Sequence, residues 1–425
     1  MPTRLIPSAQ VDHFVHDHLP PPEQWPELRF DRPELQLPAQ VNAVQALFER
    51  AAAAGHADRP LFRSDERTLS YAQAQVEVNR IANALTVELG LVPGNRVLLR
   101  GGNSVAMALA WLATVQAGLI AVATMPLLRA KELGAILQKA QPVLALCDVK
   151  LQDELKAALS ADPATAGMTM LVFNTGGAEV PHSLEAMAQR QCVHSAPCPT
   201  AATDIALLAF TSGTTGTPKG VCLDGAALQA ITQGLVQALA PLDIRRHLCA
   251  LPLAVLLENV AGLMAPLAHG AECVVLPLQE VGLVGSSSFD PARLQAAVVR
   301  HQPHSMILLP QMLRAWAAWL AHTGERAPAS LRMVAVGGAS VGTPLVQAAR
   351  AVGIPAYEGY GLSEGASVQT LNLPWADCPG SAGQPLPHAR VRVNSEGEIE
   401  VAGSLFRGYL GDAAAPPAWW PTGDL

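Results

Sequence analysis

The chain has 425 residues, of which half are hydrophobic and 15% are charged, a composition that is typical of globular proteins and excludes an intrinsically disordered chain. Its net charge is −7 and no cluster of Lys and Arg stands out, so we expect binding neither to nucleic acid nor to an anionic membrane. Seven scattered cysteines without a Cys-x-x-Cys pair predict neither a zinc site nor a disulfide framework, and the N-terminus has no apolar stretch typical of a signal peptide, so we expect a cytoplasmic protein.

The N-terminal segments predict an arm followed by buried elements. Residues 1–40 are rich in proline, and we expect them to form an extended arm that lies on the body of the protein. Residues 104–128 carry no charge and are long enough to span a bilayer, but they divide into a helical pattern (105–117) and an apolar strand (119–123). Because the same alternation recurs downstream, we interpret this stretch as a buried helix and strand and expect no integral membrane segment.

Helical patterns that alternate with short apolar runs predict an α/β fold with mainly parallel sheets. We expect two doubly wound α/β subdomains, formed by residues 41–200 and 201–364. After residue 364 the pattern changes, and residues 391–412 alternate apolar and polar side chains around turn signals, which predicts antiparallel strands. Residues 365–425 are therefore expected to form a small, antiparallel, β-barrel-like subdomain. The apolar runs on which this reading depends include residues 97–99, 119–123, 143–147, 170–173, 205–210, 247–253, 272–277, 304–310 and 332–338.

The segment FTSGTTGTPKG (residues 210–220) is the most informative motif of the chain. A flexible linker uses similar residue types, but this segment follows an apolar strand pattern and precedes a helical one, which is where α/β sheets bind ligands. Its glycines allow successive backbone N–H groups to point at one anion, and its hydroxyl groups and lysine add further donors. The spacing differs from the Walker A loop and from the G-x-G-x-x-G motif. The candidate anion ligands are Thr211, Ser212, Gly213, Thr214, Thr215, Gly216 and Lys219.

This segment resembles the phosphate loop of the adenylate-forming superfamily, which comprises acyl- and aryl-CoA synthetases, adenylation domains of peptide synthetases, and luciferases. Further stretches resemble the superfamily's motifs in the same order: VGGAS (336–340), YEGYGLSE (357–364), GEIEVAGSLFRGYLGD (397–412) and PTGDL (421–425). The resemblance covers nearly the whole chain. It implies an enzyme that joins a carboxylic acid to ATP, releases pyrophosphate, and passes the acyl group to a thiol, with ATP, Mg²⁺ and CoA as the expected cofactors and co-substrate.

The resemblance also implies roles for individual residues. Tyr360 would stack on adenine, Ser363 would contact the α-phosphate, and Asp424 would hold the ribose hydroxyls. Lys219, Thr211 and Glu364 are the expected catalytic residues, and Thr211 and Glu364 would hold Mg²⁺. Positive charge suits this chemistry because attack of a carboxylate on the α-phosphorus builds negative charge in the transition state. The remaining expected nucleotide-binding residues are Gly337, Gly338, Ala339, Ser340, Glu358, Gly359, Gly361 and Leu362.

The identity of the acid depends on weaker signals. Residues 14–26, 93–103 and 124–133 resemble 2-aminobenzoate- and benzoate-CoA ligases, whereas LPLAVLLENVAG (251–262) resembles synthetases for longer or aliphatic acids. A hydrophobic carboxylate suits both resemblances. An alternative is that the apolar residues of the last stretch belong to the core and that Glu258 and Asn259 cap a helix. The expected pocket residues are Ala254, Leu257, Glu258, Asn259, Val260, Gly338 and Gly361.

Three further alternatives stay open at the sequence level. The thiol could belong to the phosphopantetheine of a carrier protein, or the chain could be a non-catalytic relative that senses a nucleotide or acyl-adenylate, and a homodimer is also compatible with the sequence. The resemblance implies a small C-terminal domain with a further catalytic lysine after the Thr-Gly-Asp motif, where this chain ends at Leu425. We therefore expect the 425-residue chain to bind ATP and acyl-adenylate but to form thioester poorly. The spacing of the histidines predicts no metal site, and Trp316 and Trp319 are expected to serve packing.

Overall fold

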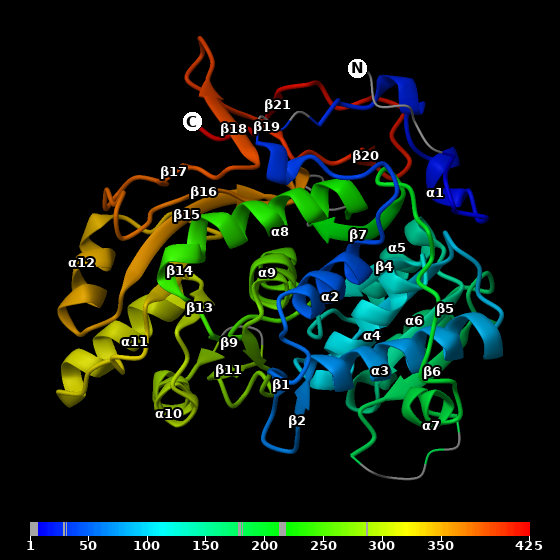
Figure 1. The fold of residues 1–425 in the computed structure, drawn as a ribbon, viewed down its shortest axis with the longest axis horizontal. Coiled ribbons are helices and arrows are strands. Elements are labelled where there is room, and N and C mark those ends of the chain that lie inside the picture. Colours follow the sequence, from blue (N-terminus) through cyan, green and yellow to red (C-terminus); the bar gives the residue numbers. More distant parts are fainter. Residues whose placement is uncertain are drawn as a thin grey trace.

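Two β-sheets lie on either side of a central layer of helices (Figure 1). The computed structural model describes residues 7–28, 30, 32–176, 180, 182–211, 218–285 and 288–425. Most strand pairs in the two sheets are parallel, and further helices cover the outer faces, so the predicted α/β class is confirmed. Within the described ranges, no helix combines the length and the apolarity that crossing a membrane requires.

The seven-stranded sheet has the strand order β20-β8-β7-β4-β3-β5-β6. The run from β7 to β6 is parallel, whereas β8 and β20 add to one edge in antiparallel fashion. The strands are β3 (Arg96–Arg100), β4 (Ile120–Thr124), β5 (Leu144–Asp148), β6 (Thr169–Phe173), β7 (Ile205–Thr211), β8 (Lys219–Asp224) and β20 (Gly408–Tyr409).

The nine-stranded sheet has the order β17-β16-β15-β14-β13-β9-β10-β1-β2. Its central strands are parallel, and β2, β16 and β17 pair in antiparallel fashion at the two edges. The strands are β1 (Pro60–Arg63), β2 (Thr68–Ser70), β9 (Arg246–Leu248), β10 (Glu272–Val274), β13 (Ser305–Leu308), β14 (Met333–Val336), β15 (Ala356–Leu362), β16 (Ser367–Leu371) and β17 (Gln384–Pro385). A short hairpin of β11 (Leu283–Val284) and β12 (Ser288–Phe289) stands apart from both sheets.

The buried side chains form three hydrophobic clusters, and the helices fall into three groups according to the cluster in which they pack. The central group shares one core with both sheets; it comprises α2 (Ala43–Ala53), α3 (Tyr71–Asn83), α4 (Val105–Gln116), α7 (Leu184–Gln189), α8 (Gly225–Leu239) and α9 (Ala265–His269). The outer face of the nine-stranded sheet carries α10 (Pro291–His301), α11 (Pro310–Thr323) and α12 (Thr343–Ala351). The outer face of the seven-stranded sheet carries α5 (Ala130–Ala140) and α6 (Gln152–Ala161).

Shorter helical segments complete the description. They are α1 (Phe14–Asp17), η1 (Pro22–Gln24), η2 (Pro33–Leu35), η3 (Ala84–Glu88), η4 (Val149–Leu151), η5 (Ala240–Leu242), η6 (Glu258–Met264) and η7 (Ser363–Gly365). Of these, η3 and η6 are π-helical.

Two sequence predictions about buried segments are confirmed. The uncharged stretch 104–128 forms the buried helix α4 and the buried strand β4, because Ser104 caps the helix and Gly118 turns the chain. Trp316 of α11 is fully buried, and its indole N–H donates to Oε1 of Gln295. Trp319 of the same helix packs against the same hydrophobic cluster, so both tryptophans serve packing.

The C-terminal segment forms a small sheet beside the N-terminal arm, at the top of Figure 1. Strands β18 (Ala389–Val393), β19 (Ile399–Gly403) and β21 (Trp420–Pro421) are antiparallel, as the alternating pattern predicts. Arg407 ties this region to the body, since its guanidinium pairs with buried Asp224 and donates to the carbonyl of Pro26 in the arm.

The two sheets do not separate at the boundary expected between residues 200 and 201. Strands β7 and β8 complete the seven-stranded sheet, and β1 and β2 join the nine-stranded one. The order of the strands in the sequence does not predict which sheet each strand joins, because an apolar run forms a buried strand equally well in either sheet. The division of the chain into subdomains stays a prediction.

Candidate functional site

A cavity of about 550 Å³ lies at the carboxyl ends of parallel strands from both sheets. Its walls include the ends of β4, β7, β14 and β15, which is the edge where α/β sheets commonly bind ligands. The volume is within the usual range for small-molecule sites. Motifs that are far apart in the sequence therefore meet in one cavity.

The described residues that flank the predicted phosphate loop lie at this cavity. Thr211 and Pro218 line it, and Thr211 is the antiparallel register partner of Lys219 across β7 and β8. The predicted ligands Ser212, Gly213, Thr214, Thr215 and Gly216 lie outside the described residues. Their roles stay predictions.

Tyr409 lies between two of the predicted catalytic residues. Its hydroxyl donates to Oε1 of Glu364 at 2.6 Å, and the ammonium of Lys219 lies 4.8 Å from the centre of its ring. Burial raises the pKa of the Tyr409 phenol, and the neighbouring Glu364 carboxylate raises it further, so the phenol remains a hydrogen-bond donor at neutral pH. The segment that contains Tyr409 resembles a motif of the superfamily, but the resemblance assigned this residue no role.

The sequence contained a motif that includes Tyr409, but it did not show which residues the Tyr409 side chain contacts. The Gly-Tyr pair at residues 408–409 forms the two-residue strand β20, and Tyr409 pairs with Val221 of β8. Because this pairing spans almost 190 positions, no local pattern could place the phenol beside Glu364. The motif resemblance could have named Tyr409 as a candidate, but only the fold shows its partners.

Tyr360 and Asp424, which were expected to contact adenine and ribose, lie together. The Tyr360 hydroxyl donates to Oδ2 of Asp424 at 2.6 Å. Burial, and next this carboxylate, raise the pKa of the Tyr360 phenol. Asp424 is held in place because its main-chain carbonyl accepts from the N–H of Ile399 in β19. The small C-terminal sheet thus positions Asp424 beside the cavity wall.

The hairpin of β15 and β16 supplies much of the remaining wall. Gly359, Tyr360, Gly361, Leu362 and Ser363 all line the cavity. Gly361 allows the two strands to approach closely, since a Cβ there would overlap the carbonyl oxygen of Ser367.

The segment after β14 divides into lining and exposed residues. Gly337 and Gly338 line the cavity, and Gly338 adopts a φ of 83°, in the left-handed region that favours glycine. Ala339 and Ser340 are exposed on the loop that follows. Glu358 was expected near the nucleotide, but its carboxylate is buried and accepts from the N–H groups of Gly342 and Gly380.

The residues expected to form the acyl pocket divide between the cavity wall and the core, and their role stays a prediction. Ala254, Leu257 and Asn259 line the cavity. Glu258 and Val260 are buried in the core beside it instead, and the carboxylate of Glu258 contacts Nε2 of His247 at 3.1 Å and accepts from the N–H of Leu251 at 3.2 Å. The reason is the helical turn at the start of η6, which directs successive side chains away from each other.

Glu258 also belongs to a buried group whose proximity the sequence spacing did not reveal. Ligand atoms of His247, Cys249 and Glu258 lie within 4.8 Å of one another. Their polar atoms are already engaged: Nδ1 of His247 contacts the hydroxyl of Ser305 at 2.9 Å, and Sγ of Cys249 contacts the carbonyl of Gly262. The group therefore holds β9 and η6 together.

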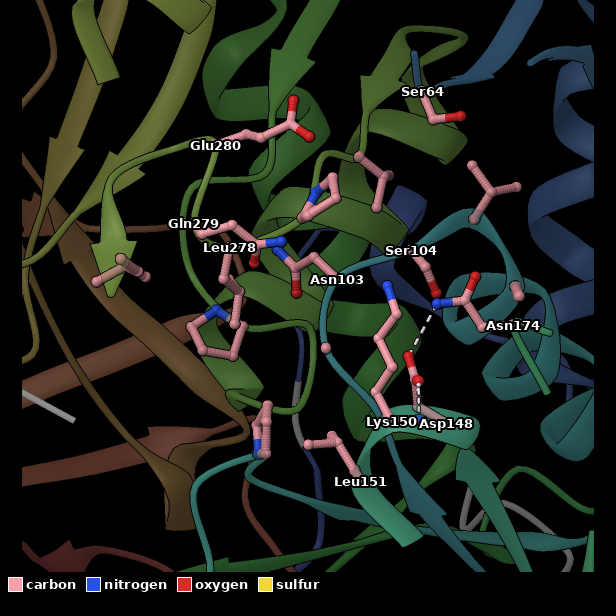
Figure 2. Close-up of a pocket in the computed structure, with 18 of the residues that line it drawn as sticks. Ser64, Asn103, Ser104, Asp148, Lys150, Leu151, Asn174, Leu278, Gln279 and Glu280 are labelled. Carbon is pink, nitrogen blue, oxygen red and sulfur yellow. Dashed lines mark hydrogen bonds between the residues drawn. The ribbon is translucent and has the colours of Figure 1, made fainter. Parts of the chain in front are cut away.

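A second cavity, of about 1290 Å³, adjoins the first and shares Met125 and Val255 with it. Figure 2 shows that the side chains of Lys150 and Asn103 extend into this cavity. At the edge of the cavity, Nδ2 of Asn174 donates a hydrogen bond to Oδ2 of Asp148. Asn103 is buried, and its amide donates to the carbonyl of Leu251 and accepts from the N–H of Leu253, which both lie in the segment after β9. Its side chain thus links the segment after β3 to the segment after β9 at the cavity. None of the sequence motifs indicated this cavity.

Comparisons with known proteins agree with these features. A family model described as "AMP-binding enzyme" matches residues 48–410. The chain is 26% identical to 4-coumarate–CoA ligase 2 of Oryza sativa subsp. japonica, over 100% of this chain and 79% of that protein. It is 24% identical to benzoate–CoA ligase of Thauera aromatica, over 91% and 72% respectively.

Solved structures show the same fold. A crystal structure of the anthranilate CoA ligase AuaEII in complex with anthranoyl-AMP superimposes with a TM-score of 0.80, at 21% sequence identity. The match covers 92% of this chain and 76% of that one.

Proposed function

The chain belongs to the AMP-binding enzyme family, and on this premise we propose that it activates a hydrophobic carboxylic acid with ATP and transfers the acyl group to CoA. The observation that carries this proposal is that residues of the nucleotide motifs and residues of the apolar stretch after residue 250 line the same cavity. From the nucleotide motifs these are Thr211, Gly338 and Tyr360, and from the apolar stretch they include Leu253 and Leu257. A cavity with this lining suits an acyl group joined to an adenylate.

The proposed reaction has two steps. A carboxylate oxygen of the acid attacks the α-phosphorus of ATP, the bond from that phosphorus to the bridging oxygen breaks, and pyrophosphate leaves. The CoA thiol then loses its proton to solvent and attacks the acyl carbon, and AMP leaves. Catalysis of the first step consists mainly of positioning and charge stabilisation.

Lys219 and the Tyr360–Asp424 pair account for most of the positioning. The ammonium of Lys219 is held over the Tyr409 ring near the loop that is expected to bind the phosphates, where it would offset negative charge. Asp424 would accept from ribose hydroxyls with its carboxylate, and the ring of Tyr360 would contact the base. No nucleophilic side chain is required, so the hydroxyl groups of residues 211–217 act as ligands.

The residues present also suit a magnesium ion. Magnesium prefers oxygen ligands, and Thr211 offers a hydroxyl while Glu364 offers Oε2, which has no hydrogen-bond partner among the described residues. When bound, the ion would neutralise charge on the phosphates. Tyr409 would then hold the Glu364 carboxylate in the orientation that leaves Oε2 available.

Exchange of labelled pyrophosphate into ATP tests the proposal. The chain is incubated with ATP, Mg²⁺ and single acids: benzoate, 2-aminobenzoate, octanoate and palmitate. We expect at least one acid to stimulate exchange and Lys219→Ala to lower the stimulated rate at least tenfold. Stimulation by no acid would contradict the proposal.

The acceptor is examined in the same preparation. Addition of CoA should yield a small amount of thioester with the stimulating acid, in line with the poor thioester formation expected of the 425-residue chain. An acyl group that appears only on a phosphopantetheinylated carrier protein would point to that acceptor instead. A chain that binds ATP or adenylate without exchange under any condition would indicate a sensor.

A further inference from the structure

We propose that the acid activated here carries a neutral hydrogen-bonding group, a hydroxyl or an aromatic amine, on its hydrophobic body, and that Asn259 and Ser367 recognise it. The inference rests on the proposed function, because it assumes that the 550 Å³ cavity holds the acid. It narrows the substrate from any hydrophobic carboxylate to a polar-substituted one.

The first observation is the side chain of Asn259. Only 3% of this residue is exposed, it lines the cavity, and its Oδ1 is buried without a hydrogen-bond partner. The backbone N–H of Asn259 continues the helix by donating to Val255, but Oδ1 of its carboxamide is buried and accepts from no described residue. A buried amide oxygen without a partner is costly, so such an oxygen in a cavity wall indicates a donor on the occupant.

The second observation is Ser367, at the start of β16. It is 6% exposed, lines the same cavity, and has an unpartnered Oγ. Its backbone adopts a φ of 131° and follows Ala366 with a φ of 63°, so two consecutive residues other than glycine have unfavourable backbone conformations. Such strain is commonly kept where it positions a functional group.

Other polar side chains of the cavity wall differ from Asn259 and Ser367 because they already have hydrogen-bond partners or lie at the other end of the cavity. Thr124 donates to the carbonyl of Leu99, Glu132 accepts from the N–H of Arg129, and Tyr360 donates to Asp424. Thr211 and Ser363 lie at the end expected to hold the phosphates. Asn259 and Ser367 are the two described polar residues of the wall that remain both deeply buried and unpartnered.

The chemistry of these groups specifies the class of substituent. An amide offers one donor end and one acceptor end, and a serine hydroxyl can act as either, so a hydroxyl group on the acid can satisfy both. None of the described wall residues is positively charged, so a second carboxylate on the acid would lack a counter-charge. The one negatively charged wall residue, Glu132, is exposed and already accepts from the N–H of Arg129, so it is not a buried partner for an ammonium. A plain hydrocarbon body would leave both polar groups unsatisfied, and sites of that kind reject the analogue that lacks the polar group.

Direct binding by isothermal titration calorimetry tests this inference on the full chain. The probes are benzoate, 2-aminobenzoate, 3-hydroxybenzoate, 4-hydroxybenzoate and octanoate. Each is titrated in the presence of Mg²⁺ and α,β-methylene-ATP, in which the bond between the α- and β-phosphorus atoms has no bridging oxygen and is not cleaved. We expect at least one substituted benzoate to bind about tenfold or more tightly than benzoate. The variants Asn259→Leu and Ser367→Ala, alone and combined, should reduce this preference to about twofold or less, while Ser381→Ala, outside both cavities, should keep it.

Each outcome separates the inference from the proposed function. Equal binding of benzoate and its substituted forms, or a preference that survives in the double variant, overturns the inference even if exchange occurs. A preference that depends on Asn259 and Ser367, without acid-stimulated pyrophosphate exchange, supports the recognition and overturns the proposed activity. Failure of every acid to bind overturns both.

Discussion

At the scale of single residues, Tyr409 is the contact on which the arrangement of charges depends. Its ring lies beneath the Lys219 ammonium and its hydroxyl donates to Glu364. One side chain thus contacts a cation from β8 and an anion from η7. We regard Tyr409 as a positioning residue, because both residues that it contacts are the ones expected to meet the phosphates and the metal ion.

Removal of the Tyr409 hydroxyl tests this role. Tyr409→Phe keeps the ring under Lys219 but removes the hydrogen bond to Glu364. A hydrogen bond to a charged group contributes about 1.5–3 kcal/mol of net interaction free energy. Because Glu364 is then less well oriented, we expect the Mg²⁺ concentration for half-maximal ATP binding to rise about tenfold. Tyr357→Phe is the matched control, since that ring stacks on Arg350 outside the cavity. An unchanged Mg²⁺ dependence would show that Glu364 needs no help from Tyr409.

At the scale of elements, the hairpin of β15 and β16 depends on the absence of a side chain at Gly361. A Cβ there would meet the carbonyl oxygen of Ser367, which belongs to the backbone and cannot move aside cheaply. We expect Gly361→Ala to lower the free energy of unfolding by about 1–3 kcal/mol and to weaken ATP binding, as measured by urea denaturation and calorimetry. Gly134→Ala, in α5 with open space around it, is the control and should be neutral or stabilising. Equal stability of the two variants would contradict this account of the hairpin.

His388 couples the same hairpin to pH. It is fully buried against Gly234 of α8, and Nε2 donates to the carbonyl of Val368 in β16. Burial lowers the pKa of His388 to about 4. Because an unfolded histidine titrates near its usual pKa of about 6.5, the unfolded chain binds more protons between pH 6.5 and 4, and stability falls as the pH falls through that window.

The corresponding variant is His388→Gln, which does not titrate but can still donate to Val368. We expect the wild type to lose up to about 3 kcal/mol of unfolding free energy between pH 6.5 and 4 on account of this residue, and the variant to lose correspondingly less. Chemical denaturation at pH 6.5, 5.5 and 4.5 measures the difference. His322→Gln, at an exposed position, should behave as the wild type. Parallel pH profiles for His388→Gln and the wild type would show that this histidine is not a source of acid sensitivity.

The elements also show how far sequence reasoning reaches. Helix α4 and strand β4 were predictable because the apolar stretch has a capping serine at its start and a glycine at its turn. The antiparallel strands β18 and β19 were predictable from alternation around a turn at residues 394–397. The membership of β1 and β2 in the distant sheet was not, because the pairing of β1 with β10 joins residues more than 200 positions apart.

For the site, motifs identified residues that the fold then brings together, but they did not reveal which way side chains point. Tyr360 and Asp424 meet as partners of one hydrogen bond, which their separate motifs could not state. Glu258 and Asn259 are neighbours in the sequence, yet one is buried beside His247 and the other lines the cavity. That difference depends on the direction of the π-helix η6, for which the sequence carries no local signal.

At the scale of the whole molecule, the site is built where the two sheets and the C-terminal sheet converge. Strand β7 leads from the seven-stranded sheet into the cavity, β14 and β15 end there from the nine-stranded sheet, and Asp424 arrives from the C-terminal segment. Arg407 secures that segment through Asp224 and the carbonyl of Pro26. The central claim is therefore that one cavity holds an acyl group and a nucleotide at the same time.

Calorimetric binding of a stable acyl-adenylate analogue tests that claim most directly. The analogues are benzoyl- and 2-aminobenzoyl-adenylate with a sulfamoyl group in place of the phosphate, compared with AMP and with each free acid. We predict that at least one analogue binds about 100-fold or more tightly than either AMP or the acid alone, because the joined ligand occupies both halves of the cavity without the entropic cost of binding two molecules. Binding of the analogues no tighter than that of AMP would contradict the claim.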